Sequence, residues 1–103
     1  MKQVLLSADG PISVFSVPDQ VADNLEQYCN EFCCNWLPKS PDAAKYRMSS
    51  GDGVVMCYNE KDFIEYLNQY VCDQQSTLVE TIRLNGWEDE LPEAYRDLPY
   101  FYF

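Results

Sequence analysis

The chain contains no histidine, and its 7 lysine and arginine residues stand against 17 aspartates and glutamates, which gives a formal charge of −10 at pH 7. The absence of histidine excludes catalytic triads and proton relays that depend on an imidazole. The shortage of cations excludes a basic face of the kind that binds nucleic acid directly or attaches to an anionic membrane surface. A basic protein partner, or no role beyond solubility, fits this charge better.

The chain also lacks a long hydrophobic run. Its first apolar stretch, Val4 to Leu6, is soon followed by Ser7 and Asp9, so the sequence predicts neither a signal peptide nor a membrane span. We therefore expect a cytoplasmic protein, a setting in which thiols stay reduced. The 5 cysteines are an odd number without a secretory context, which favours free thiols over a disulfide framework.

The chain has enough hydrophobic residues to form a core. Of its 103 residues, 47% are hydrophobic and 15% aromatic, which suits a single globular domain spanning residues 1–103. The clearest periodic signal lies in residues 18–37, where apolar side chains recur at steps of three and four. These side chains are Val21, Leu25, Tyr28, Cys29, Phe32 and Trp36. The spacing predicts a long amphipathic helix that begins at Pro18 and ends near Leu37, before Pro38.

Strand signals precede and follow this helix. Residues 2–8 and 12–17 are joined by the turn sequence Asp9-Gly-Pro11 and predict an N-terminal hairpin. The short apolar run of residues 54–58 predicts a buried strand. The four aromatic residues 100–103 predict a C-terminal strand anchored against the hairpin, because free aromatics there would favour association.

A second amphipathic helix is predicted over residues 60–72, where Asn59 and Asp62 resemble a capping box. The segment 76–86 is ambiguous: Leu78, Ile82 and Leu84 would share one face of a strand, yet Thr77 and Glu80 are spaced as a second capping box. For this segment we expect a short helix. Residues 39–53 are expected to form a connecting segment with a turn at 49–53.

Together these elements predict an α+β fold. We expect a small antiparallel or mixed sheet, built from the hairpin, the strand near 54–58 and the C-terminal strand, with two main helices, about 18–37 and 60–72, packed on one face. This layering buries two amphipathic stripes at once. A mainly helical domain with a stray hairpin is the alternative.

The cysteines are expected to be structural. Cys29 and Cys33 share a helix face, but the sequence offers no second pair of soft ligands at the spacing of a zinc site. They also lie in the middle and later part of a helix in acidic surroundings, which does not lower a thiol pKa. Acidic segments such as 88–90 and 51–53 lack the alternating oxygen ligands of a calcium loop. We therefore predict no metal and no cofactor.

The remaining signals are acidic and aromatic. Residues 1–50 carry four basic and six acidic side chains, about −2, which leaves about −8 for residues 51–103. Aromatic side chains are enriched in protein interfaces, although they can also simply pack the core with their hydroxyls at the surface. The candidate interaction surface consists of Glu60, Asp62, Glu65, Asp73, Glu88, Asp89, Glu90, Tyr100 and Tyr102.

Three functions are compatible with these features. The first is a non-enzymatic, cytosolic protein-interaction module whose acidic second half and aromatic C-terminus bind a basic partner. The second is a mimic of nucleic acid that blocks a DNA- or RNA-binding protein, which requires carboxylates in rows at phosphate spacing. The third is a small enzyme that uses cysteines or carboxylates, which requires a cleft that holds at least two acids, or a thiol and a cation, within hydrogen-bond reach.

Several strings also resemble a known group of sequences. They include Tyr-Cys-Asn-Glu-Phe-Cys at residues 28–33, Cys-Tyr-Asn-Glu-Lys-Asp-Phe-Ile at residues 57–64 and Leu-Pro-Glu-Ala-Tyr-Arg-Asp-Leu-Pro at residues 91–99. These strings are similar to a set of short, acidic, uncharacterised bacterial proteins from anaerobes. The resemblance covers most of the chain and implies no activity, cofactor or residue role.

Overall fold

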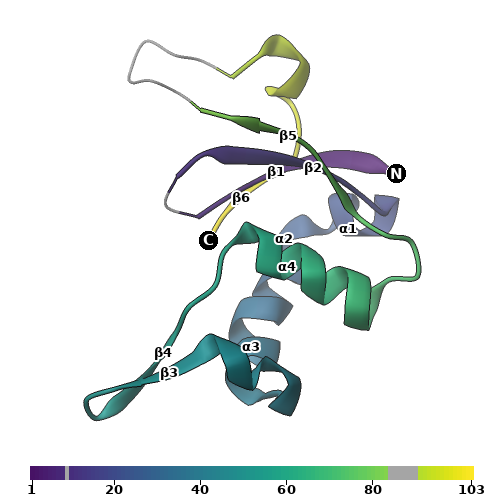
Figure 1. Cartoon of the computed structure of the whole chain (residues 1–103). Coiled ribbons are helices and arrows are strands. Elements are labelled where there is room, and N and C mark those ends of the chain that lie inside the picture. The colour runs from purple at the N-terminus through teal and green to yellow at the C-terminus, as the bar shows by residue number, and fades with distance from the viewer. Residues whose placement is uncertain (9, 84–90) are drawn as a thin grey trace.

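The computed structural model describes residues 1–8, 10–83 and 91–103, and it shows helices packed on one face of a four-stranded sheet (Figure 1). The strands of this main sheet are β1 (Lys2–Ser7), β2 (Ile12–Val17), β5 (Thr77–Ile82) and β6 (Tyr100–Tyr102), in the order β5-β2-β1-β6. β2 is antiparallel to both of its neighbours, whereas β6 is parallel to β1. The predicted α+β class with a mixed sheet is confirmed.

The N-terminal hairpin supplies side chains to both faces of the sheet because successive residues of a strand alternate. Val4, Leu6, Phe15 and Val17 join the core beneath the helices. Leu5, Val14 and Ile82 form a smaller cluster on the opposite face, which we call the outer face. Residues 91–98, which include the 3-10 helix Glu93–Tyr95, pack on part of the outer face through Leu91, Tyr95 and Leu98.

The first main helix is a nearly continuous series of turns from Asp19 to Lys39. It comprises α1 (Asp19–Asp23), α2 (Leu25–Asn30), the π-helical segment Glu31–Trp36 and α3 (Leu37–Lys39). Asn24 interrupts it with a φ of −134°, and its side-chain amide donates to the Gln20 carbonyl at 3.0 Å. The helix ends two residues later than predicted, because Ser40 N donates to Trp36 O at 2.9 Å and closes a turn that contains Pro38.

The second main helix is α4 (Glu60–Tyr66), which continues as the π-helical segment Leu67–Val71. The predicted capping box is confirmed: Asp62 N donates to Asn59 Oδ1 at 3.2 Å, and Asn59 N donates to Asp62 Oδ2 at 2.9 Å. The two helices meet through Phe32, whose buried ring contacts Phe63 and Tyr66 with centroids 5.5 and 5.2 Å apart. The predicted packing of both helices on one face is also confirmed.

The prediction of a short helix over residues 76–86 is wrong for the part that the structure describes. Residues 77–82 form β5, in which Ile82 pairs with Ile12 of β2 and Thr77 pairs with Ser16. The sequence of this segment fits a helix or a strand. The open edge of β2 favours the strand, because it supplies hydrogen-bond partners for the backbone of residues 77–82. Residues 84–86 lie outside the described residues.

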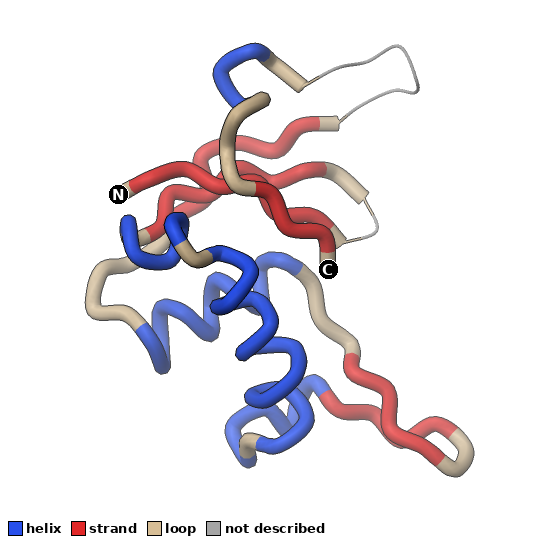
Figure 2. Tube along the Cα trace, turned by 180° about the vertical axis from the view of Figure 1, so that it is seen from behind, coloured by secondary structure: helices blue, strands red, loops and turns tan. Residues whose placement is uncertain are grey.

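The strand predicted near 54–58 exists, but its expected place in the main sheet and its expected burial are both wrong. β4 (Gly53–Met56) pairs with β3 (Arg47–Ser50) in a separate antiparallel hairpin, which follows the 3-10 helix Pro41–Tyr46. We call β3, β4 and their turn the arm. Figure 2 shows the arm extending away from the helices, with Gly51 in its turn at a φ of +58° that suits glycine.

The C-terminal strand is confirmed, and it divides the aromatic tail between two environments. Leu5 N donates to Pro99 O and Phe103 N donates to Ser7 O, both at 2.8 Å, so the tail is held along β1. Phe101 and Phe103 are partly buried against the main core, whereas Tyr100 and Tyr102 are exposed.

Candidate functional site

The acidic candidates on α4 do not form one exposed row. Glu60 is only 9% exposed and accepts a hydrogen bond of 3.1 Å from Ser13 Oγ of β2. Asp62 turns back to cap the helix. Glu65 is partly exposed and lies 3.5 Å from Lys45 Nζ. The row that a mimic of nucleic acid requires therefore lacks Glu60.

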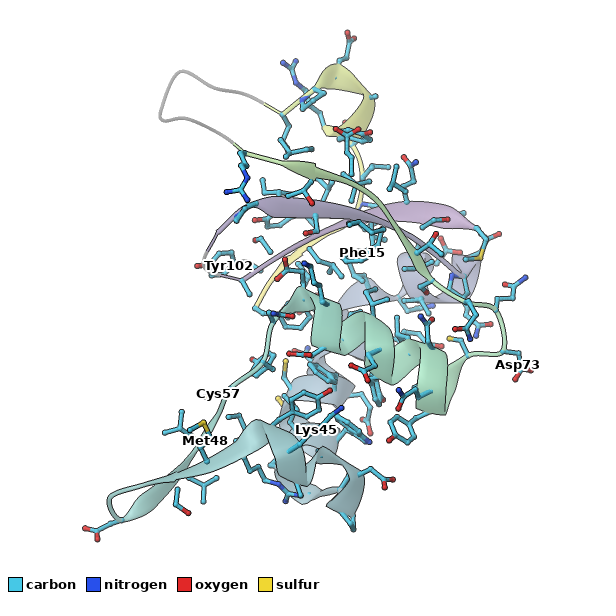
Figure 3. The ribbon with its side chains drawn as sticks, in the orientation of Figure 1. Phe15, Lys45, Met48, Cys57, Asp73 and Tyr102 are labelled. Atoms are coloured by element: carbon cyan, nitrogen blue, oxygen red, sulfur yellow. The ribbon has the colours of Figure 1, made fainter. Side chains whose placement is uncertain are left out.

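The other candidates lie elsewhere on the molecule. Figure 3 places Asp73 in the loop that follows the second main helix, at the opposite side of the view from Tyr102. Glu88, Asp89 and Glu90 lie outside the described residues. Asp73 and Tyr102 are therefore parts of different surfaces.

The two predicted tyrosines are brought together at one end of the outer face. In the parallel register of β1 and β6, Leu5 pairs with Tyr100 and Ser7 pairs with Tyr102, so both tyrosines share a face with Ser7. Ser7 is buried, and its Oγ lies 2.6 Å from Tyr100 Oη. This hydroxyl pair connects the end of β1 to the start of β6.

Beside these tyrosines the outer face is hollowed, with a volume of about 400 Å³. All four strands of the main sheet line the hollow or lead into it. Its lining includes Ser7, Ile12, Ile82, Arg83, Tyr100 and Tyr102. The hollow therefore combines two isoleucines with three hydroxyl groups and one guanidinium.

Sequence reasoning selected Tyr100 and Tyr102 but missed Ser7, Ile82 and Arg83. Ser7 and Tyr100 are 93 positions apart, and no local pattern pairs them. Arg83 was missed because residues 76–86 were assigned to a helix. The alternating apolar residues of that segment also fit a strand, and a strand there would have placed Ile82 beside the N-terminal hairpin.

The arm is the second unusual surface. Met48, Val54 and Val55 have exposed fractions of 56%, 59% and 50%. Cys57 is also exposed and lies at the base of the arm, with its Sγ 3.4 Å from Met48 Sδ (Figure 3). Monomeric soluble proteins seldom leave neighbouring large apolar side chains exposed without a use for them.

Three of the five thiols, Cys29, Cys33 and Cys72, are poorly suited to nucleophilic chemistry. Cys29 is fully buried among apolar side chains, and burial raises its pKa well above the usual range for cysteine. Burial also raises the pKa of Cys33 and that of Cys72. A raised pKa means less thiolate at neutral pH, and the thiolate is the reactive form.

Within residues 1–8, 10–83 and 91–103, no group of three Cys, Asp or Glu side chains is arranged to hold a metal ion. In the same part of the chain, no helix has the length and apolar character needed to cross a membrane.

Comparison of the chain with protein-family models, with curated proteins and with solved structures found no match. The resemblance to short acidic bacterial proteins therefore stays a prediction from the sequence.

Proposed function

We propose that this chain is a non-enzymatic, cytoplasmic protein-interaction module, and that its arm binds an extended segment of a basic partner protein. One observation carries the proposal: the arm exposes apolar side chains on both of its faces, and within the described residues each of its strands has only one strand partner. Added-strand recognition uses these two features, because main-chain hydrogen bonds give affinity and side-chain contacts give specificity.

The pairing of the arm explains why its apolar side chains stay exposed. Met48 pairs with Val55 and Ser49 pairs with Val54, so the first pair lies on one face of the ribbon and Val54 lies on the other. Neither face is covered by the main sheet, because the two strands form a sheet of their own. A partner strand paired along either edge of the arm would place its alternating side chains beside the exposed apolar side chains on both faces.

The base of the arm is held firmly. Arg47 Nη1 donates to Pro38 O at 3.0 Å, and its second terminal nitrogen donates to Ser40 O. Cys57 N donates to Tyr46 O at 2.8 Å and extends the hairpin ladder by one bond. Because its base is fixed to the end of the first main helix, the arm presents its outer part at a defined angle. A preformed surface reduces the entropy lost on binding.

The charge distribution favours a basic partner. Residues 47–56, which form the arm, contain one cation, Arg47, and one anion, Asp52. The formal charge of −10 therefore belongs to the body of the protein. A second copy of the chain would bring two such bodies together at an electrostatic cost, whereas basic flanks on a different partner would be attracted to them.

The proposal is tested by capture from a lysate of the native source. The arm variant carries Met48→Thr, Val54→Thr and Val55→Thr, which lower hydrophobicity and place a residue suited to strands at all three positions. The matched control carries Leu78→Thr and Val79→Thr, which change two exposed apolar residues of β5. We expect the native chain and the control to recover a basic protein that the arm variant loses, and we expect less recovery at high salt.

Two results would contradict the proposal. One is recovery of the same proteins by the arm variant and the native chain, or of none by either at low and high salt. The other is a dimer of the native chain in light scattering that becomes a monomer in the arm variant, which would make a second copy the occupant of the arm. Far-UV circular dichroism of both variants controls for folding.

A further inference from the structure

We propose that the hollow on the outer face binds a small monocarboxylate with an apolar or aromatic body, through the Arg83 guanidinium and the hydroxyl pair of Ser7 and Tyr100. This site is separate from the arm, and the inference does not depend on the proposed partner. It follows from the position of the hollow, the donors around it, its charge and its size.

The apolar part of the hollow comes from the ends of two strands. Ile12 begins β2 and Ile82 ends β5, and the two residues pair directly in the antiparallel register. Both therefore present their side chains on the outer face, in line with Leu5 and Val14. The segment 91–98 packs on the same face and leaves the hollow beside the tyrosines. An apolar ligand body would bury against the two isoleucines.

The polar part includes a hydroxyl donor for which the described residues supply no recorded acceptor. Two hydroxyl groups carry two protons, and the hydrogen bond of 2.6 Å between Ser7 Oγ and Tyr100 Oη uses one of them. Ser7 is 1% exposed and is fixed in the sheet, whereas Tyr100 is 46% exposed and borders the hollow. The second proton remains for an acceptor that enters the hollow. A carboxylate oxygen is such an acceptor, and a hydrogen bond to an ionised acceptor is stronger than one to a neutral group.

Arg83 supplies the charge. It lies directly after β5 and lines the hollow. Three ion pairs are recorded in the described part of the chain, at Met1, Lys2 and Lys45, and none of them involves Arg83. A guanidinium matches a carboxylate with two parallel hydrogen bonds, which a lysine cannot reproduce.

The volume of the hollow and the negative charge of the protein favour a small ligand with a single negative charge. A volume of about 400 Å³ lies at the small end of the range for small-molecule sites. The formal charge of −10 repels ligands with several negative charges, such as polyphosphates. One local cation offsets this repulsion for a single carboxylate. That carboxylate could belong to a free organic acid or to the C-terminus of a peptide.

The test uses phenylacetate as the probe and follows binding to the full chain by NMR titration. We expect saturable shifts at the backbone amides of residues 82, 83 and 100. Phenylacetamide, which has the same shape without the charge, should bind at least about tenfold more weakly. A short peptide that ends in phenylalanine with a free carboxylate separates the two sources: tighter binding than phenylacetate would indicate a peptide C-terminus, and weaker binding would indicate a free acid.

Substitutions distinguish binding at Arg83 from a general effect of the protein's net charge on ligand affinity. Arg83→Gln should weaken phenylacetate binding about tenfold, and Arg83→Lys should have an intermediate effect because it keeps the charge but loses the fork. Lys61→Gln is the matched control, since it removes one exposed cation from α4 and should leave the affinity unchanged. Equal binding of phenylacetate and phenylacetamide, equal losses in Arg83→Gln and Lys61→Gln, or no shifts at millimolar probe would each overturn the proposal.

Discussion

Ser13 Oγ donates a hydrogen bond of 3.1 Å to Glu60 Oε1, and both side chains are buried where β2 packs against the first turn of α4. The contact joins residues that are 47 positions apart. It also places a carboxylate at the N-terminus of a helix, where the helix dipole favours negative charge. A residue that the sequence suggested for an interaction surface thus connects the sheet to the helical layer.

Removal of this donor should destabilise the protein. In Ser13→Ala the Glu60 carboxylate stays buried without its recorded partner, which we expect to lower the free energy of unfolding by about 1–3 kcal/mol. Ser16→Ala on the same strand is the control and should change it by less than about 0.5 kcal/mol, because Ser16 is partly exposed. Urea denaturation measures both. Equal effects of the two substitutions would mean that the hydrogen bond contributes nothing specific.

Phe32 should be the most sensitive position of the aromatic core. Its fully buried ring contacts five others, with centroid distances between 5.2 Å to Tyr66 and 6.1 Å to Phe103. Phe32→Ala is expected to lower the free energy of unfolding by about 3–5 kcal/mol, since it leaves a cavity as well as losing contacts. Tyr70→Ala removes a half-exposed ring and should cost about 1 kcal/mol or less. A smaller loss for Phe32→Ala than for Tyr70→Ala in urea denaturation would contradict the structure of this core.

Thiol labelling should distinguish the cysteines by burial. Cys34 and Cys57 are exposed and should react with a disulfide reagent within the first phase at mildly alkaline pH. Cys29 should react only when the chain unfolds, because it is buried and its pKa is raised. The variant Cys34→Ser/Cys57→Ser provides the control. Cys33 and Cys72 are only partly exposed, so mass spectrometry identifies the thiol that is labelled, and fast labelling of Cys29 in this variant would contradict its burial.

Cys29 should also behave as a small core residue on substitution. Cys29→Ala or Cys29→Val is expected to change the free energy of unfolding by about 1 kcal/mol and to leave partner binding intact. Thermal or urea unfolding measures the first effect, and capture of the partner measures the second. Stoichiometric zinc binding by the native chain, or loss of an activity without loss of stability, would assign these thiols a different role.

Stability should fall at alkaline pH because Tyr66, which is buried, and Tyr58, which is partly buried, resist ionisation. Burial, and secondarily contact with Cys33, raises the pKa of Tyr58 to about 12. The pKa of Tyr66 is raised as well, mainly by burial. In the unfolded chain a tyrosine ionises near about pH 10. The unfolded state therefore releases protons first, and the stabilisation is complete below about pH 10 and is lost as the pH rises toward 12.

The measurement is urea unfolding at neutral pH and at about pH 11, with tyrosinate absorbance of the folded protein followed in parallel. In Tyr58→Phe stability should decline less steeply with pH, because phenylalanine has no hydroxyl proton that the unfolded chain would release more readily than the folded one. A stability that is unchanged or increases between the two pH values would contradict the burial of these hydroxyl groups.

Several elements followed from local sequence. The stripe of Val21, Leu25, Cys29 and Phe32 predicted the first main helix because its period matches one helix face, and all four side chains are buried. The capping box of Asn59 and Asp62 predicted the start of α4 because the interacting atoms are three residues apart. Likewise, the candidate tyrosines of the hollow could be identified because terminal aromatics are unusual.

By itself the sequence determined the hairpin, the two amphipathic helices and the capping box of α4, since each of these depends on residues close together in the chain. The overall charge follows from composition alone. Tertiary structure alone decided that residues 77–82 pair with β2 as a strand, because their local pattern fits both elements and the open edge of β2 selects one. It also decided that Val54 and Val55 lie on an exposed arm, since a run of apolar residues does not reveal which surface covers it. Tertiary structure also decided the hollow beside Tyr100. Ser7, Ile82 and Arg83 line it together because strands that are far apart in the sequence pair in the main sheet.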